Sequence, residues 1–265
     1  MTGRLAMRPE GCGGPDWGRR PWRSGRFAVA LIVALGLYGM GALATPVSAR
    51  PAVMPELEPT EAAGTDFGLP FAEPAGLGSW YLAQPYGNTI YAYFERQTLY
   101  GAGQGLHMGL DFAAACGTPV VAIGDGTVRS VDGPGGALPH NLMISHPGGV
   151  VSFYGHLLRR PELTVGQAVR RGEVVALTGD MYETCTASPH LHLEIRDESL
   201  GRAFNPLLFI DADWHSLALI GASPQLFERD LDAPRRWQAM DDQPEIRFGG
   251  PLLNDFSAAW PSDGG

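Results

Sequence analysis

The sequence predicts an all-β fold class, a compact and mainly antiparallel β domain built either as two packed sheets or as an open barrel. Two observations support this. From Leu106 onward, apolar segments of strand length are separated by turns that contain glycine. Few windows show the spacing of an amphipathic helix, and 36 Gly and 22 Pro among 265 residues favour a fold rich in turns.

The N-terminal segment has the composition of an export signal. Six arginines precede an apolar run over residues 27–44, which ends near the small residues Val47, Ser48 and Ala49. We therefore interpret residues 1–49 as a signal peptide or a membrane anchor. Both interpretations predict an exported protein that is secreted, periplasmic or associated with the cell envelope.

The rest of the chain is acidic. Residues 1–49 hold six Arg, Glu10 and Asp16, so their removal changes the net charge from −9 to −13. A chain with this charge is not suited to the phosphate backbone of nucleic acids. The protein is therefore not expected to bind nucleic acid, and any membrane contact is expected only through the N-terminal anchor.

The next segment, residues 50–79, is expected to be a linker, because five prolines interrupt an Ala- and Glu-rich stretch without periodicity. The folded domain is predicted over residues 80–210. Within it, Trp80 and Tyr86 are expected to pack rather than line a groove, and His140 and His146 to lie at the surface. Strands are expected at 106–112, 118–123, 127–131, 141–146, 150–154, 165–169, 173–178 and 190–196.

Two glycine-rich turns in this domain predict hairpins. Gly124-Asp125-Gly126 separates the second and third expected strands, and Pro147-Gly148-Gly149 separates the fourth and fifth. Residues 211–265 form a C-terminal extension of unknown role, with short helices expected at 211–219 and 224–237. No chemistry-bearing motif is found in this extension.

One expected strand carries the motif His190-Leu191-His192-Leu193-Glu194-Ile195. Alternate side chains of a strand share a face, so the leucines and Ile195 face the core and the two histidines face the other way with Glu194. Two such imidazoles can bind a metal. The alternative is a partly exposed strand with incidental polar residues.

A second motif, His107-Met108-Gly109-Leu110-Asp111, places a histidine and a carboxylate on one face of a strand, and Gly109 lets another group approach the backbone closely. A catalytic zinc needs three protein ligands and one open position. His107, Asp111 and either His190 or His192 would supply them. His156, in Tyr154-Gly155-His156, is a further candidate.

With these segments in order, the sequence resembles the lysostaphin-type (LytM-like) zinc metalloendopeptidases of bacterial cell walls. The resemblance covers about residues 80–210. It is carried by the segments 107–112, 117–120, 124–128, 154–157, 165–169, 189–192 and 205–207. The loop before His190 departs from the family pattern, because it looks about two residues longer and lacks a late glycine.

The resemblance implies one zinc ion per chain, bound by His107, Asp111 and His192 in a groove of the β domain, with His156 and His190 as catalytic histidines. It also implies hydrolysis of peptide bonds in peptidoglycan, for cell-wall remodelling or lysis. The alternative is a non-catalytic cell-wall adaptor that regulates another murein hydrolase. Such adaptors have typically lost zinc ligands, whereas all five positions are present here.

Two other functions are disfavoured. A biotinyl or lipoyl carrier needs a modifiable lysine, and all 19 basic residues are arginines. A thiol hydrolase that uses Cys185 with His190 conflicts with export, because an exported thiol tends to oxidise. Cys116 lies five residues after Asp111 and Cys185 five before His190, so the two loops could meet at one rim of the site. We predict an intramolecular disulfide between these cysteines.

Overall fold

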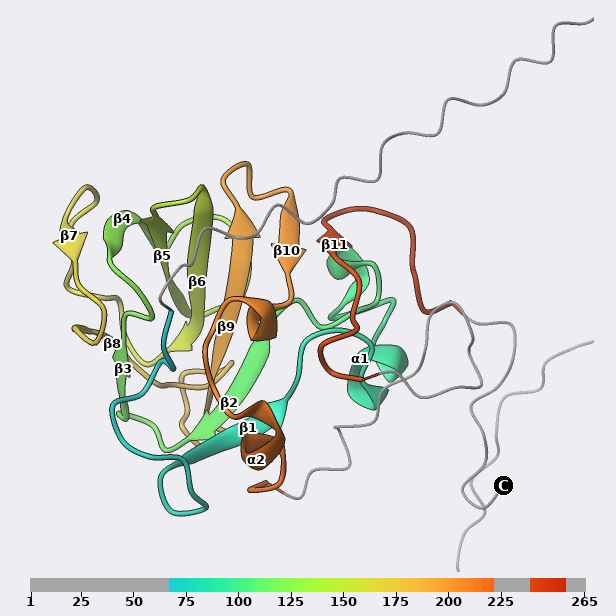
Figure 1. Cartoon of the computed structure of the whole chain (residues 1–265), viewed down its shortest axis with the longest axis horizontal. Coiled ribbons are helices and arrows are strands. Elements are labelled where there is room, and N and C mark those ends of the chain that lie inside the picture. Colours follow the sequence, from blue (N-terminus) through green and yellow to red (C-terminus); the bar gives the residue numbers. More distant parts are fainter. Residues whose placement is uncertain (1–66, 222–238, 256–265) are drawn as a thin grey trace, which may run out of the picture. The chain divides into compact units, whose positions relative to one another are not determined.

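The computed structural model describes residues 67–221 and 239–255 and confirms a mainly antiparallel β fold with few helices (Figure 1). The large sheet has the strand order β1-β2-β9-β6-β5-β4-β7. The short strand β10 pairs with β9 and with β11, and β3 pairs with β8 in a separate two-stranded sheet. All of these strand pairs are antiparallel.

The elements are short, as the frequent glycine turns predict. The strands are β1 Trp80–Gln84, β2 Leu110–Ala114, β3 Pro119–Val121, β4 Gly126–Val131, β5 His140–His146, β6 Val150–Leu157, β7 Ala168–Val169, β8 Val174–Leu177, β9 His190–Asp197, β10 Arg202–Phe204 and β11 Ile246–Arg247. The α-helices of the described ranges are α1 Ile90–Phe94 and α2 Trp214–Ala218, each capped at its N-terminus by a polar side chain, and 3₁₀ helices lie at Gly101–Gly103 and Pro206–Leu208. None of the helices in the described ranges is long and apolar enough to span a membrane.

Strand β9 lies in the middle of the large sheet, between β2 and β6 (Figure 1). Its sequence alternates as expected. Leu191, Leu193 and Ile195 are fully buried in the main hydrophobic core, so His192 and Glu194 lie on the opposite face.

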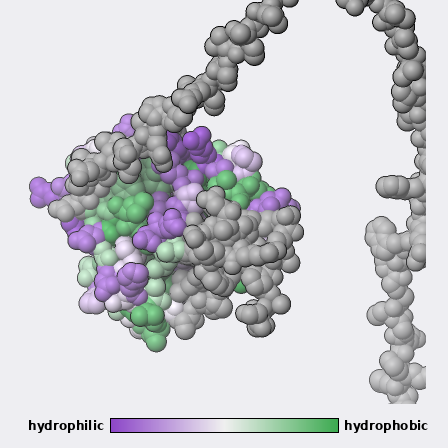
Figure 2. Space-filling view, turned by 45° about the vertical axis from the view of Figure 1, so that its right-hand side comes forward, coloured by the Kyte–Doolittle hydropathy of each residue, from purple (hydrophilic) through white to green (hydrophobic). Residues whose placement is uncertain are grey.

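On the surface shown in Figure 2, hydrophobic side chains form patches separated by hydrophilic ones.

One of the two expected hairpins is present. Strands β5 and β6 pair across Pro147-Gly148-Gly149, as predicted. The expected hairpin at Gly124-Asp125-Gly126 is wrong, because β3 pairs with β8 and β4 pairs with β5 and β7. These glycines instead permit close packing, since a Cβ on Gly126 would lie 2.5 Å from the Ser145 carbonyl oxygen.

The packed region extends beyond residues 80–210 on both sides. Phe67 and Phe71 are buried in the core, and Phe71 stacks on Trp80, so residues 67–79 are not a linker in the described part of the chain. Trp80 and Tyr86 are buried, as expected. The expected helix at 211–219 is present in part as α2, whereas the signal or anchor and the helix at 224–237 lie outside the described residues.

His146 corrects another expectation. It is buried rather than superficial, and its ring nitrogens lie 2.8 Å from the Asp125 carbonyl oxygen and 2.7 Å from the Ser152 hydroxyl. Burial lowers its pKa, although the Asp125 carbonyl opposes this shift. His140 is half-buried and contacts Asp132.

Candidate metal centre and active site

The register of the central strands brings residues that are distant in sequence together. Between β2 and β9, Asp111 lies opposite His192, and between β6 and β9, Gly155 lies opposite His192. His192 is therefore flanked by a carboxylate on one side and by a residue without a side chain on the other.

His107 reaches the same place from outside the strand. Strand β2 begins at Leu110 rather than at Leu106, and His107 instead exchanges two backbone hydrogen bonds with Gly87. Gly109 allows this path, because a Cβ there would lie 2.4 Å from the Leu193 carbonyl oxygen. The close approach expected at Gly109 is therefore made by β9.

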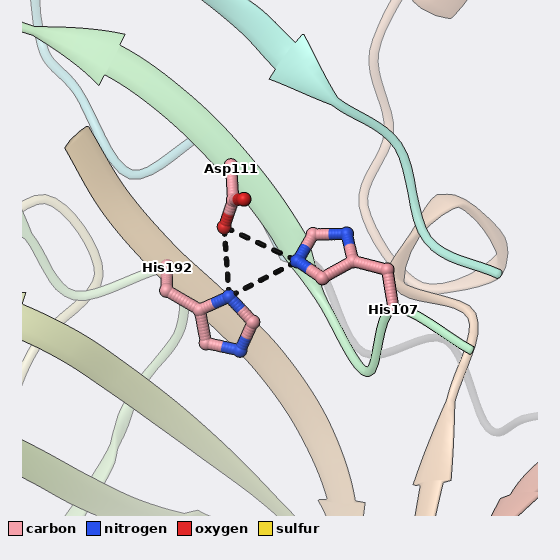
Figure 3. Close-up of side chains that lie close together, drawn as sticks. All are labelled: His107, Asp111 and His192. Carbon is pink, nitrogen blue, oxygen red and sulfur yellow. Dashed lines mark hydrogen bonds and ion pairs between the residues drawn. The ribbon is translucent and has the colours of Figure 1, made fainter. Parts of the chain in front are cut away.

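Three donor atoms converge at this point (Figure 3). His107 Nε2 lies 3.2 Å from both His192 Nδ1 and Asp111 Oδ1, and His192 Nδ1 lies 2.8 Å from Asp111 Oδ1. Ligands bound tetrahedrally to a zinc ion at ~2.0–2.2 Å are roughly 3.3–3.6 Å apart. The spacing of the three atoms thus fits a small cation.

The other nitrogens of the two imidazoles support the same fit. His107 Nδ1 lies 2.7 Å from the Pro85 carbonyl oxygen, and His192 Nε2 lies 2.9 Å from Glu194 Oε1. When each of these nitrogens carries the proton, the nitrogens that face Asp111 present lone pairs. Two lone pairs and a carboxylate facing one point repel one another unless a cation lies between them.

The charges around this cluster follow from burial and pairing. Burial opposes ionisation of Glu194, but Arg196 and His192 outweigh it and lower the pKa of Glu194 to about 2. Burial likewise disfavours the charged form of His192, yet its hydrogen bonds to Asp111 and Glu194 raise its pKa to about 9 without a cation. The pKa of Asp111 is held well below its usual value by His107 and His190, against the effect of burial.

A second pair of histidines lies beside the first. The rings of His156 and His190 have centroids 4.7 Å apart, and the ring of His156 lies 5.9 Å from that of His192. His156 Nδ1 is 2.5 Å from the Leu138 carbonyl oxygen and His190 Nδ1 is 2.7 Å from that of Ser188. In both rings, a proton on Nδ1 leaves Nε2 free to exchange one.

Burial, and then the neighbouring His192 and His190, lowers the pKa of His156 to about 4. The imidazole is therefore neutral at neutral pH and can accept a proton there. Its backbone has a φ of 56°, an uncommon value for a residue other than glycine. Such strain is frequent where a side chain has to be aimed into a site.

The sequence matches a known family over this region. The sequence model described as "Peptidase family M23" matches residues 105–206, which include all five predicted site residues. This stretch is a peptidase family M23 domain.

Relatives of the M23 domain have different names. An "Uncharacterized metalloprotease" of Haemophilus influenzae is 39% identical over 101 residues, 38% of this chain and 20% of the relative. The "DD-carboxypeptidase/endopeptidase Mpg" of Neisseria meningitidis is 37% identical over 102 residues, 38% of this chain and 22% of the relative. The "Murein hydrolase activator NlpD" of Escherichia coli is 31% identical over 114 residues, 42% of this chain and 28% of the relative.

The aligned region thus spans only 20% to 28% of the length of these curated relatives. Among solved structures, the catalytic domain of lysostaphin from Staphylococcus simulans aligns with 25% identity and a TM-score of 0.39, and covers 49% of this chain and 91% of that one. The metal implied by the family is consistent with the His-Asp-His cluster described above.

A groove surrounds these residues and is lined by the M23 domain together with residues outside it. Its lining combines small side chains, among them Ala83, Ala113 and Ala187, with the aromatic rings of Tyr91 and Tyr182. Tyr91 and Tyr182 are exposed, so they are accessible to a ligand.

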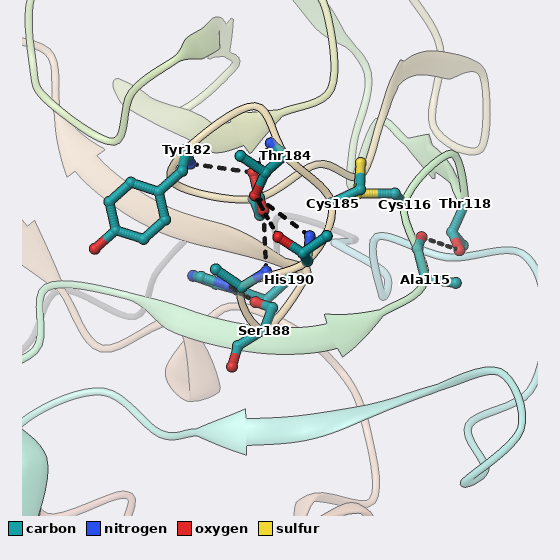
Figure 4. The surroundings of a disulfide bond; sticks show 11 residues. Ala115, Cys116, Thr118, Tyr182, Thr184, Cys185, Ser188 and His190 are labelled. Atoms are coloured by element: carbon teal, nitrogen blue, oxygen red, sulfur yellow. Dashed lines mark hydrogen bonds between the residues drawn. A yellow bond between two sulfur atoms is a disulfide. The ribbon is translucent and has the colours of Figure 1, made fainter.

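One rim of the groove is formed by the loop before β9, where the sequence departs from the family pattern. The predicted disulfide between Cys116 and Cys185 is present and ties this loop to the end of β2 (Figure 4). Asp180 organises the loop, since its carboxylate accepts hydrogen bonds from the backbone of Tyr182, Thr184 and Ala187 and from the Thr184 hydroxyl. The same loop supplies the Ser188 carbonyl that orients His190.

Sequence reasoning missed two parts of the site. Glu194 was placed on the histidine face of β9, but its contact with His192 and the two hydrogen bonds from Arg196 were not predicted. Period-two alternation also places Arg196 on that face, so this signal was available. The Pro85 carbonyl that holds His107 could not be found, because a backbone acceptor leaves no mark in a sequence.

Proposed function

We propose that the protein is a zinc-dependent endopeptidase that hydrolyses peptide bonds in peptidoglycan. The observation that carries this proposal is the convergence of His107 Nε2, Asp111 Oδ1 and His192 Nδ1, beside two further histidines in a groove. Two imidazole nitrogens and one carboxylate oxygen are a donor set typical of catalytic zinc. We further propose that the chain is exported through residues 1–49.

In this function, His107, Asp111 and His192 would hold the metal. A bound zinc supplies Lewis acidity to a carbonyl oxygen and lowers the pKa of bound water to ~7. The buried carboxylate of Glu194 fixes the ring of His192 through Nε2, and the Pro85 carbonyl fixes that of His107 through Nδ1. Neither ring can rotate without losing its hydrogen bond.

His156 and His190 would carry the proton transfers. His156 is neutral at neutral pH, so its Nε2 can take a proton from the attacking water. Once protonated on both nitrogens, a histidine of this pair can give its Nε2 proton to the leaving amine or donate a hydrogen bond to the developing oxyanion. The Leu138 and Ser188 carbonyls keep both rings oriented during these steps.

The substrate class is proposed from the relatives and the groove. Mpg is named a DD-carboxypeptidase/endopeptidase and NlpD a murein hydrolase activator, and both names concern the cell wall. A groove lined by alanines and exposed tyrosines suits the short side chains of peptidoglycan peptides.

The name of NlpD also supports a second candidate, a non-catalytic adaptor that regulates another murein hydrolase. The complete set of five polar residues here favours the enzyme, because an adaptor has no need of three converging donors.

The decisive experiment is digestion of purified peptidoglycan with the mature full chain. We expect new peptide termini by mass spectrometry, their loss after treatment with a chelator, and their return on addition of zinc. An adaptor would bind the sacculus without new termini and would stimulate a second hydrolase with or without the chelator.

A further inference from the structure

The C-terminal segment 239–255 packs against the metal-binding region, although it lies outside the M23 match. Its strand β11 pairs with β10, which extends the sheet beyond β9 (Figure 1). Two separate sets of contacts lead from this segment to the two histidines of the cluster.

The first set leads to His107, whose ring is held by Pro85 and whose backbone is held by Gly87. Between these two residues, the buried Tyr86 hydroxyl lies 2.9 Å from the Pro244 carbonyl oxygen and accepts a hydrogen bond from the backbone N–H of Ile246. The next residue beyond Gly87, Asn88, donates its backbone N–H to Gln243 Oε1 at 2.8 Å.

The same segment holds the residues that immediately precede His107. Asn254, which is completely buried, donates from Nδ2 to the Gly105 carbonyl oxygen at 2.5 Å and to Asn88 Oδ1 at 3.2 Å. Gly105 has no room for a side chain, since a Cβ would lie 2.1 Å from Asn254 Oδ1. The C-terminal segment thus contacts both the stretch around Gly87 that holds His107 and the residues just before His107 in sequence.

The second set leads to His192 through charged side chains. The Arg196 guanidinium lies over the rings of both Phe153 and Phe248, at 4.3 and 4.7 Å from their centroids. Arg196 donates two hydrogen bonds to Glu194, at 2.6 and 2.9 Å, and Glu194 in turn lies 2.9 Å from His192 Nε2. Phe248 therefore covers one face of the cation that orients the partner of His192.

We propose that residues 239–255 are a positioning segment of the metal centre, which holds His107 through Asn254 and the backbone of residues 85–88 and holds His192 through Phe248, Arg196 and Glu194. This inference rests on the proposed metal site. Its physical basis is preorganisation. Ordering a ligand before it binds costs free energy and so weakens metal binding, and loss of a residue that orients a ligand typically lowers metal affinity 10–100-fold.

The experiment uses the full-length mature chain and two substitutions, one for each set of contacts. Asn254→Ala removes the hydrogen bond to Gly105, and Phe248→Leu retains an apolar side chain but removes the aromatic face over Arg196. Zinc affinity is measured by competition with a chromophoric chelator, and the absorption bands of bound Co²⁺ report ligand geometry. We expect each variant to bind zinc roughly 10-fold more weakly and to shift the Co²⁺ bands.

Three controls separate positioning from general destabilisation. Glu245 lies on the same segment but faces Arg202 at the surface, so Glu245→Gln should leave the zinc affinity and the Co²⁺ bands unchanged. Val169→Ala removes buried methyl groups from β7, at the far edge of the sheet, and should lower Tm without changing zinc affinity. Phe248→Tyr keeps the aromatic ring, so it should show the zinc affinity and the Co²⁺ bands of the wild type.

The outcomes are distinguishable. Wild-type affinity and Co²⁺ bands in Asn254→Ala and Phe248→Leu, with a fall in Tm like that of Val169→Ala, would overturn the positioning role. Failure of the wild-type chain to bind either Zn²⁺ or Co²⁺ would instead overturn the metal site on which the inference rests.

Discussion

The two histidine pairs of the site differ in what faces them. His107 and His192 share Asp111 as a common neighbour, and His192 has Glu194 as a second carboxylate. His156 and His190 have only backbone carbonyls at Nδ1, from Leu138 and Ser188. Yet His156, His190 and His192 lie on paired strands of one sheet, and His190 and His192 are alternate residues of β9.

This difference is the physical basis for the different roles that we propose for nearby positions of one strand. Carboxylates around the first pair stabilise positive charge, which raises the pKa of His192 and favours a bound cation. The second pair lacks such compensation, so burial lowers the pKa of His156 and keeps the ring neutral. The first pair is suited to holding a metal and the second to moving protons.

The largest effect on metal binding and activity is expected from the three residues whose donor atoms converge. His107→Ala, Asp111→Ala and His192→Ala each leave only two donors, below the three that a catalytic zinc usually needs. We expect metal and activity to be lost together, as measured by elemental analysis and peptidoglycan digestion. His140→Ala, outside the groove, is the matched control and should retain both.

A smaller effect is expected from the second pair. His156→Ala and His190→Ala remove a proton-transfer group while the three donors remain, so zinc should stay near one per chain and turnover should fall by ~10²–10⁴. The proposed contrast between the two pairs would be wrong if His190→Ala loses zinc while His192→Ala keeps it. In that case β9 presents the other histidine to the metal.

The disulfide sharpens the comparison, because its loop carries Ser188, whose carbonyl oxygen orients His190 of the second pair. Replacing Cys116 and Cys185 by serine opens a crosslink that spans 69 residues, which should lower the free energy of unfolding by roughly 2–4 kcal/mol. Urea titration measures this loss, and retained zinc with reduced turnover would show that the dependence is confined to His190.

The smallest expected effect is on the pH dependence of folding stability. The pKa of His156 is about 4 when folded and ~6.5 in an unfolded chain, so the unfolded state binds more protons between these values. The stabilisation from neutral His156 is complete above pH ~6.5 and is lost as the pH falls from there through 4, by about 3.4 kcal/mol at most.

Denaturant titrations of the metal-free protein at pH 7 and 4.5 measure this term. In His156→Gln the fall in stability between the two pH values should be smaller than in wild type. An equal fall in both proteins would mean that His156 is not the buried neutral group, and the contrast between the pairs would be lost.

Periodicity in the sequence predicted much of the site. The alternation of leucines and histidines in β9 predicts which side chains share a face, because strand geometry has a period of two. The spacing of Cys116 and Cys185 from the candidate ligands also predicted their disulfide. Local patterns of this kind depend only on the order of residues, so they can be recognised without knowledge of the fold.

Tertiary structure alone decided the rest. Alternation leaves His190 and His192 equivalent as ligands, although the family resemblance implies His192, and the β2–β9 register places His192 opposite Asp111. The pairing of β3 with β8 and of β4 with β5 and β7 differs from the hairpin that the glycine turn suggests. The contact of Phe248 with Arg196 joins residues 52 positions apart. Such contacts are fixed by packing and hydrogen bonding between distant segments, and neither alternation nor composition records which segments will meet.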